Sequence, residues 1–199
     1  DNGVYDHEML DSWTPEEVQD LGGYIKHDRD NMFTYSGLQQ LIDKYLIKNR
    51  ITGAIYETPQ IAYMAIAMCL FSGYEDKVRR TKEAYDAYST FKVNLPTPIM
   101  AGVRSTIKQF ASCVLVDIGD DLDSIFASLH AVGKYTARRA GIGLNAGRIR
   151  PINSPIRGGE VIHTGLIPYL KIFESAVKAT SQNGLRGGSA TVHVPFWHY

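Results

Sequence analysis

Cysteine is scarce in this 199-residue sequence, neither sign of charge is in excess, and no hydrophobic run is long. Two cysteines are too few for a disulfide scaffold, which favours a reducing, cytoplasmic setting. Lysine plus arginine number 21, as do aspartate plus glutamate, so net charge gives no reason to expect nucleic acid or an acidic membrane. The longest apolar run, residues 61–71, is about half of the roughly 20 residues that a membrane-spanning helix needs. We therefore expect binding to neither nucleic acid nor membrane.

Processing signals and repeats are lacking as well. The chain begins Asp1-Asn2-Gly3 without an initiator methionine, and no basic start followed by an apolar core marks a secretory signal. There is no internal repeat and no low-complexity tract. Hydrophobic residues make up 44% and charged residues 21%, an ordinary composition for a soluble protein of one domain or one and a half.

The first hundred residues are predicted to be helical. Thr14-Pro15-Glu16-Glu17 is a helix start, because threonine caps, proline suits the first helical position and acids complement the positive helix end. Thr58-Pro59 repeats this pattern ahead of the apolar run. Apolar residues recur at helical spacing between residues 38 and 45, and a further helix is predicted over residues 76–88. We interpret residues 1–108 as a helical N-terminal domain with a scaffold role.

Two segments of this first half are predicted to lie outside the helices. In Leu95-Pro96-Thr97-Pro98 the two prolines disfavour a helix and favour an extended segment. His27-Asp28-Arg29-Asp30 is interpreted as a solvated cluster of charges.

The second half alternates between strand and helix patterns, which predicts a parallel sheet with helical crossovers. Three parallel strands with a bare edge would leave backbone groups and apolar faces exposed, and a closed eight-unit barrel takes roughly 250 residues. We therefore predict an α/β fold that another polypeptide segment completes. The predicted strands are residues 110–118, 140–146 and 190–195, and the predicted helices are residues 122–138 and 160–179.

Three glycine-rich segments, residues 141–148, 157–160 and 184–188, are candidates for phosphate binding. Glycine lets backbone N–H groups approach a ligand, and Arg148, Arg150, Arg157 and Arg186 could supply phosphate donors. In particular, Arg157-Gly158-Gly159 precedes the helix predicted from Glu160, which is the arrangement of an anion site. Tight turns are the alternative reading of each segment. A dinucleotide fingerprint is disfavoured for the first one, because residues 135–139 resemble a helix end and not a strand.

Cys113 lies in the middle of the first predicted strand. Strand alternation places it on the face opposite Ser112 and Val114. From spacing alone, buried packing is the commoner role for such a cysteine. Cys69, within the apolar run, is interpreted as a core residue.

Several stretches of the chain carry a family resemblance. Taken in order, they resemble the large, catalytic subunit of class I ribonucleotide reductases. The stretches are Leu95–Met100, Gln109–Leu115, Arg139–Arg150, Ser154–Glu160 and Gln182–Thr191, and in the helical half His27–Asp30 and Ser89–Lys92.

The resemblance implies a helical domain followed by a ten-stranded α/β barrel, of which residues 109–199 would form the first part. It implies an N-terminal fragment without the ATP-cone, without the rest of the barrel and without the radical cysteine. The implied activity is thiyl-radical reduction of ribonucleoside diphosphates to deoxyribonucleotides. This chain would bind no cofactor itself. A diiron-tyrosyl radical would reside in a separate small subunit, and thioredoxin or glutaredoxin would be the reductant. A homodimer would form through the helices 122–138 and 160–179.

The resemblance also implies roles for individual residues. Cys113 would be the first member of a redox-active cysteine pair. Substrate-binding residues would be Thr97, Ser112, Ala140, Gly141, Gln182 and Arg186. A dNTP or ATP effector would be bound by Asp120, Asp121, Leu122, Arg150 and Ile156.

Two other interpretations stay open at this point. The chain could be a nucleotide-binding and dimerising fragment without catalysis, which the glycine segments and long helices would also fit. Within the family, the cobalamin-dependent class shares the barrel loops. The long helical first half and His27–Asp30 favour class I.

Overall fold

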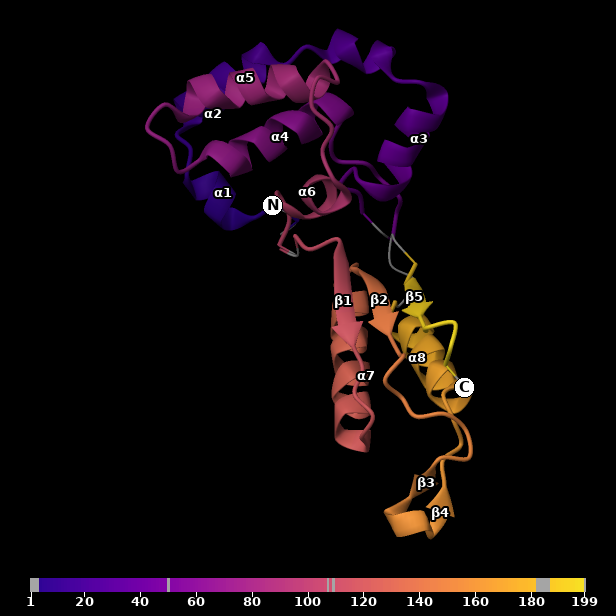
Figure 1. Cartoon of the computed structure of the whole chain (residues 1–199). Coiled ribbons are helices and arrows are strands. Elements are labelled where there is room, and N and C mark those ends of the chain that lie inside the picture. Colours follow the sequence, from indigo (N-terminus) through magenta and orange to yellow (C-terminus); the bar gives the residue numbers. More distant parts are fainter. Residues whose placement is uncertain (1–3, 50, 107, 109, 182–186, 199) are drawn as a thin grey trace. The chain divides into compact units, whose positions relative to one another are not determined.

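The chain forms two compact units, Asp1–Phe110 (the first unit) and Ala111–Tyr199 (the second unit). The computed structural model describes residues 4–49, 51–106, 108, 110–181 and 187–198. Figure 1 shows the first unit as helical and the second as a small sheet with helices. The elements are α1 (His7–Asp11), α2 (Pro15–Tyr24), the 3-10 helix η1 (His27–Met32), α3 (Tyr35–Lys44), α4 (Pro59–Phe71), α5 (Lys77–Ser89), α6 (Thr97–Gly102), β1 (Cys113–Asp117), α7 (Leu122–Ala137), β2 (Gly141–Asn145), β3 (Pro155–Ile156), the 3-10 helix η2 (Arg157–Gly159), β4 (Val161–Ile162), α8 (Ile167–Thr180) and β5 (Ala190–His193).

Two helix starts in the first unit are confirmed at the predicted residues. Thr14 caps α2, where its hydroxyl accepts from the Glu17 N–H at 3.3 Å and the Glu17 carboxylate accepts from the Thr14 N–H at 3.0 Å. This reciprocal pair satisfies two backbone donors that a helix start otherwise leaves unpaired. Thr58 caps α4 in the same way, accepting from the N–H of Ile61 at 3.3 Å.

Helix α4 is the centre of the core of the first unit. It is buried on almost all sides, and its Ile66 packs in one cluster with Leu21 of α2, Leu41 of α3, Tyr85 of α5 and Met100 of α6. An apolar helix without a polar face is stable in water only when other helices surround it. Among the residues that the structure describes, no helix is both long and apolar enough to cross a membrane.

The prediction of an extended segment at Pro96–Pro98 is wrong. Residues 97–102 form helix α6, with Pro96 as its N-cap and Pro98 in the first turn. The first turn of a helix needs no backbone N–H as an intrahelical donor, so proline is tolerated there. The prolines therefore mark a helix start, as they do in α2 and α4.

The solvated charge cluster predicted at His27–Asp30 is wrong for two of its four residues. The segment is the 3-10 helix η1, in which Arg29 forms an ion pair with Asp86 at 2.7 Å. Asp30 accepts a hydrogen bond at 2.9 Å from the amide of Gln60, a side chain with no exposed surface. These partners lie far along the chain, so the local pattern of charges did not reveal them.

The α/β fold predicted for the second unit is confirmed. Strands β1, β2 and β5 form a parallel sheet in the order β1-β2-β5, with Cys113 opposite Gly141 and Ile142 opposite Ala190. Helices α7 and α8 pack on one face of the sheet, as Figure 1 shows. The described strands form an open sheet and no closed barrel, as expected for the first part of one.

The helix predicted over residues 160–179 begins later than expected. Val161–Ile162 form strand β4, which pairs with β3 in a short antiparallel hairpin, and α8 starts only at Ile167. Gly165 has φ of 81°, a left-handed conformation that interrupts a helix, and a proline in the first turn of α8 marks its true start. The hairpin lies apart from the sheet in Figure 1.

Candidate functional site

The two faces of the parallel sheet differ in what covers them. Val114 and Val116 of β1 and Leu144 of β2 pack against the core formed with α7 and α8. Alternation along β1 places Cys113, Leu115 and Asp117 on the opposite face, where all three are exposed, Leu115 to 84%. The second unit therefore presents an exposed thiol and a carboxylate on a face of the sheet that its own helices do not cover.

Cys113 is the first residue of β1 and is exposed, so the expectation of buried packing is wrong. Its partner in the sheet register is Gly141 on β2, which has no side chain. The pair is held in place by the Gly141 N–H, which donates to the carbonyl of Ser112 at 2.8 Å. A thiol beside a glycine in an outermost strand keeps free space around it, which a nucleophile or redox group requires.

The structure brings four predicted site residues together at the amino end of the sheet. Ser112 and Cys113 lie at the start of β1, and Ala140 and Gly141 lie at the start of β2. Ala140 and Gly141 are buried, so they can offer backbone groups and little else, while Ser112 is half-buried and offers a hydroxyl.

The first part of the first glycine segment belongs to the sheet. Gly141 and Gly143 lie inside β2, within the strand predicted over residues 140–146. A Cβ added to Gly143 would lie 2.6 Å from Cδ2 of Leu115, so the glycine makes room for the neighbouring strand's side chain.

The carboxyl end of the sheet carries a network of polar side chains. The Asn145 amide donates to Asp117 at 2.9 Å, and Arg148 pairs with the same carboxylate at 2.8 Å. Carboxyl ends of parallel strands are the usual place for ligand sites in α/β sheets. The two ends of this sheet thus carry different chemistry, a thiol at one and charged groups at the other.

Asp120 and Arg150, both predicted effector residues, are in direct contact. The Asp120 carboxylate accepts from Nε of Arg150 at 2.7 Å and from the Arg150 backbone N–H at 2.7 Å. The two side chains are 37% (Arg150) and 33% (Asp120) exposed. Because the pair uses only Nε, the terminal nitrogens of Arg150 have no partner among the described residues.

Three more predicted effector residues lie near the chain segment after β1 or in the hairpin. Asp121 caps α7 by accepting from the Ser124 N–H at 2.8 Å, and hydrogen bonds from Ser124 hold the pKa of its carboxyl below the usual value. Leu122 is the first residue of α7 and is exposed, and Ile156 is a half-buried residue of β3.

Thr97 belongs to the first unit and is the first residue of α6. It is half-buried, and its hydroxyl lies 3.0 Å from the hydroxyl of Tyr45. Tyr45 is not among the site residues predicted from the sequence, which places it only in an apolar pattern at helical spacing. It is separated from Thr97 by 52 positions, so no local pattern could have linked the two.

Family models and curated relatives identify the chain's relationships. Residues 111–199 match the model "Ribonucleotide reductase, barrel domain", and residues 31–107 match "Ribonucleotide reductase, all-alpha domain". The chain belongs to the ribonucleotide reductase large-subunit family. The recognition made from the sequence motifs is confirmed at this level.

Three relatives illustrate the similarity to this reductase family. The chain is 54% identical over 198 residues to ribonucleoside-diphosphate reductase 1 subunit alpha of Escherichia coli strain K12. It is 52% identical to the alpha subunit of Buchnera aphidicola subsp. Schizaphis graminum and 49% identical to that of Enterobacteria phage T4. Each match includes 98% of this chain but only 26% of the relative's length, so the chain spans about a quarter of the proteins it resembles.

Two of the residues predicted from the family resemblance, Gln182 and Arg186, lie outside the described residues. Arg157, proposed with Gly158 and Gly159 as an anion site, lies in a turn between β3 and β4. All three have left-handed backbones, with φ of 51°, 69° and 92°. The predicted helix start is therefore absent here, and with it the reason for an anion site at this position.

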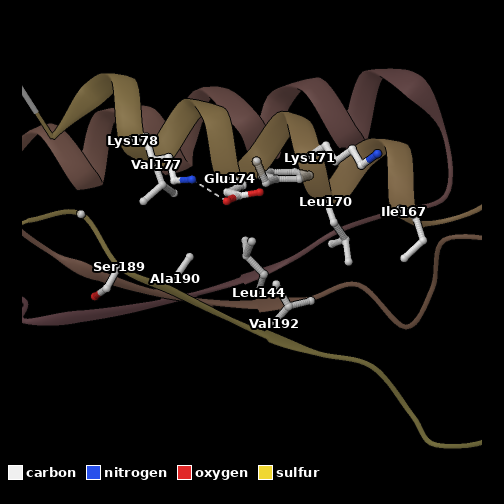
Figure 2. Close-up of a pocket in the computed structure, with 12 residues that line it drawn as sticks. Leu144, Ile167, Leu170, Lys171, Glu174, Val177, Lys178, Ser189, Ala190 and Val192 are labelled. Carbon is white, nitrogen blue, oxygen red and sulfur yellow. Dashed lines mark hydrogen bonds and ion pairs between the residues drawn. The ribbon is translucent and has the colours of Figure 1, made fainter.

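A groove of about 480 Å³ lies between α8 and the sheet, and Figure 2 shows its lining. Leu144, Leu170, Val177 and Val192 give it an apolar floor and wall, and a Lys178–Glu174 ion pair of 2.6 Å lies along α8. None of the predicted site residues that the structure describes lines it. The part of the chain that the structure describes also contains no group of three or more His, Cys, Asp and Glu that could hold a metal ion.

Proposed function

We propose that the chain is part of the catalytic alpha subunit of a ribonucleoside-diphosphate reductase. The proposal is supported by the names of its relatives, which are about half identical to it over 98% of its length. The structural observation that carries it is the exposed Cys113 at the start of β1, opposite Gly141.

The proposed role of Cys113 is to supply one of two thiols that reduce the ribose. A diiron-tyrosyl radical in a separate small subunit would supply the unpaired electron. A thiyl radical in the rest of the large subunit would remove the 3′ hydrogen and return it at the end, so that the radical is not consumed. The thiol of Cys113 and a second thiol are then oxidised to a disulfide. Their two electrons and two protons replace the 2′ C–O bond by C–H, and the hydroxyl leaves as water. Thioredoxin or glutaredoxin would reduce the disulfide by thiol exchange.

The substrate is proposed to be held by hydroxyl and backbone groups. In the second unit these are the hydroxyl of Ser112 and the backbone of Ala140 and Gly141. In the first unit the proposed residue is Thr97. Hydroxyls and backbone N–H groups can donate to the oxygens of a diphosphate or ribose without adding a fixed charge.

The effector site is proposed to lie at Asp120 and Arg150, with Asp121, Leu122 and Ile156 beside it. A dNTP or ATP phosphate would bond to the terminal nitrogens of Arg150, which has the planar donor geometry that phosphate prefers. Asp120 orients the guanidinium through its bond to Nε at 2.7 Å. Effector binding at this site would change substrate affinity at another, which is allosteric coupling.

The proposed partners are the rest of the large subunit, the small subunit and a second copy of the large subunit. The dimer is proposed to form through α7 and α8, in place of the predicted ranges 122–138 and 160–179. Support comes from the exposed apolar residues on these helices, Phe126 at 52% and Ile167 at 61%. Apolar side chains grouped on a helix surface favour helix packing between subunits. A cytoplasmic location and the absence of nucleic-acid and membrane partners stay predictions.

The test is a comparison of the two cysteines in the complete large subunit with its small subunit. Cys113→Ser is expected to lower CDP reduction by about a hundredfold or more, because a group that acts in the reaction is removed. Cys69→Ser is the matched control: Cys69 is half-buried in α4, and burial raises the pKa of its thiol to about 12. Full turnover by Cys113→Ser would overturn the proposal.

A catalytically inert fragment that binds effectors and dimerises is the second candidate. The contact between Asp120 and Arg150 favours it, because it needs no catalytic group. Calorimetry with dTTP on the 199-residue chain distinguishes the two, since tight binding without any further polypeptide supports this candidate. We expect weak binding or none, because the sheet is open and an effector site usually needs a complete fold.

A further inference from the structure

We propose that Tyr45 is a positioning residue for substrate binding, which holds the hydroxyl of Thr97 so that Thr97 donates its own proton to the substrate. The inference rests on the proposed function, in which Thr97 contacts the substrate. It adds a residue that follows the last residue of α3 and is far from Thr97 in sequence, and it gives a chemical reason for a tyrosine at this position.

The contact that carries the inference lies inside the first unit. The hydroxyl of Tyr45 lies 3.0 Å from Oγ1 of Thr97, within hydrogen-bond distance. Tyr45 is the residue at which α3 ends, and Thr97 is the residue at which α6 begins. Both residues are half-buried, so neither is fully enclosed by the protein.

Each of the two hydroxyls can donate one hydrogen bond, and the direction decides what Thr97 can offer. If Thr97 donates to Tyr45, it has no proton left for a substrate. If Tyr45 donates to Thr97, the Thr97 proton is free for an acceptor on the other side. A diphosphate offers only acceptor oxygens, so the bound substrate selects the second direction. The chain from Tyr45 through Thr97 to phosphate is also strengthened, because linked hydrogen bonds polarise one another.

The backbone on both sides of this contact is fixed by one buried arginine. Arg104, with no exposed surface, donates from Nη2 to the carbonyl of Tyr45 at 2.9 Å and from Nη1 to the carbonyl of Met100 in α6. Its charge is compensated by Glu57, which is equally buried. The distance between Tyr45 and Thr97 is therefore set when the unit folds, and little freedom is lost when a ligand binds.

The first experiment compares two tyrosines in the complete large subunit with its small subunit. Tyr45→Phe keeps the ring and removes the hydroxyl. We expect KM for CDP to rise about fivefold, the effect of one net hydrogen bond, with kcat within about twofold. Tyr56→Phe is the matched control, because the Tyr56 hydroxyl accepts from Asn49 at 3.1 Å on the same connecting segment. It is expected to leave both constants unchanged.

A double-mutant cycle separates positioning from a structural effect. Thr97→Val removes the hydroxyl that Tyr45 holds, and we expect it to raise KM more than Tyr45→Phe does. Adding Tyr45→Phe to Thr97→Val should then change nothing further, since the two residues act as one unit. Thr97→Ser keeps a hydroxyl and should restore the sensitivity to Tyr45→Phe.

The outcomes are distinguishable. If Thr97→Val leaves KM unchanged, the proposed contact between Thr97 and substrate fails, and this inference fails with it. If Thr97→Val raises KM but Tyr45→Phe does not, only the inference is overturned. An equal rise from Tyr45→Phe in the presence and absence of the Thr97 hydroxyl overturns it too, because Tyr45 would then act by another route.

Discussion

Two arginine–carboxylate pairs, one in each unit, have the same chemistry and opposite surroundings. Arg104 and Glu57 in the first unit are both 0% exposed. Arg150 and Asp120 in the second unit are 37% and 33% exposed. Burying two charges costs several kcal/mol each, about as much as their attraction returns, whereas a half-exposed pair stays partly solvated. The buried pair of Arg104 and Glu57 can therefore contact only protein groups. The half-exposed pair of Arg150 and Asp120 can give up bound water and bind a ligand instead.

The same difference extends to the neighbouring polar groups. Around Glu57, the Tyr5 hydroxyl donates at 2.9 Å and the Ile47 N–H at 2.8 Å, so the carboxylate is surrounded by protein donors. Burial and the Glu57 charge raise the pKa of Tyr5, which keeps it a donor. In the second unit, Asp117 and Arg148 face solvent at the sheet end. The buried carboxylate of the first unit is thus enclosed by protein donors, whereas the Asp117 carboxylate of the second unit faces solvent.

The largest expected effect comes from breaking the buried pair. Glu57→Gln leaves the guanidinium of Arg104 buried without a counter-charge, which is expected to cost about 3–5 kcal/mol of unfolding free energy. Urea denaturation of the chain, followed by circular dichroism, measures this. A loss below about 1 kcal/mol would show that the pair is more hydrated than its burial indicates.

Two leucine variants compare how much the buried face and the exposed face of the sheet contribute to stability. Leu144→Ala removes a fully buried side chain of the core and is expected to cost about 2–5 kcal/mol. Leu115→Ala, on the exposed face, is expected to change stability by about 0.5 kcal/mol or less. Equal losses in thermal denaturation would mean that Leu115 is covered in the folded chain.

The half-exposed pair gives a smaller effect on stability and a larger one on binding. Arg150→Ala is expected to cost about 1 kcal/mol or less, since exposed ion pairs contribute little. In the complete subunit it is expected to weaken dTTP binding by about tenfold or more, because charge-assisted bonds to phosphate are lost. Calorimetry checks the affinity, and unchanged affinity would remove Arg150 from the effector site.

The smallest effect concerns acid stability. Burial acts to raise the pKa of Asp86, but hydrogen bonds from Tyr24 and Arg29, at 2.7 Å each, outweigh it and hold the pKa below its usual value. A depressed carboxyl pKa stabilises the fold above the unfolded value of about 3.9 and loses this contribution as pH falls through the folded pKa. Asp86→Asn should flatten the decline in stability below about pH 4. If the decline in stability below about pH 4 is the same in Asp86→Asn, other carboxylates cause it.

Much of the fold could be predicted because local signals determine it. The threonine–proline pairs at residues 14–15 and 58–59 mark helix starts through contacts within one turn. The first parallel strand follows from a short apolar run that is rich in β-branched residues. The failures have a common cause in backbone conformation and distant partners. The proline pair predicts an extended segment but begins α6, and the left-handed Gly165 delays α8 to Ile167.

The residues of the candidate site also fall into those that the sequence predicts and one that it does not. The family resemblance assigned Cys113 and Gly141 to the reaction site and Asp120 and Arg150 to the effector site, and in the structure the members of each pair are neighbours. The contact of Tyr45 with Thr97 joins residues 52 positions apart, and no motif encodes it. The sequence therefore predicts residues with reactive or binding groups, but it does not predict Tyr45, which is proposed to position Thr97.

The most direct test of the account follows the redox state of Cys113 through one turnover. The complete large subunit, reduced and freed of external thiols, is mixed with its small subunit and CDP, then quenched in denaturant with iodoacetamide. If Cys113 supplies electrons to the substrate, it is alkylated in samples quenched before CDP is added. After dCDP has formed, Cys113 is found in a disulfide, and the amount of this disulfide equals the amount of dCDP. Formation of dCDP with Cys113 still fully alkylated would contradict this role of Cys113.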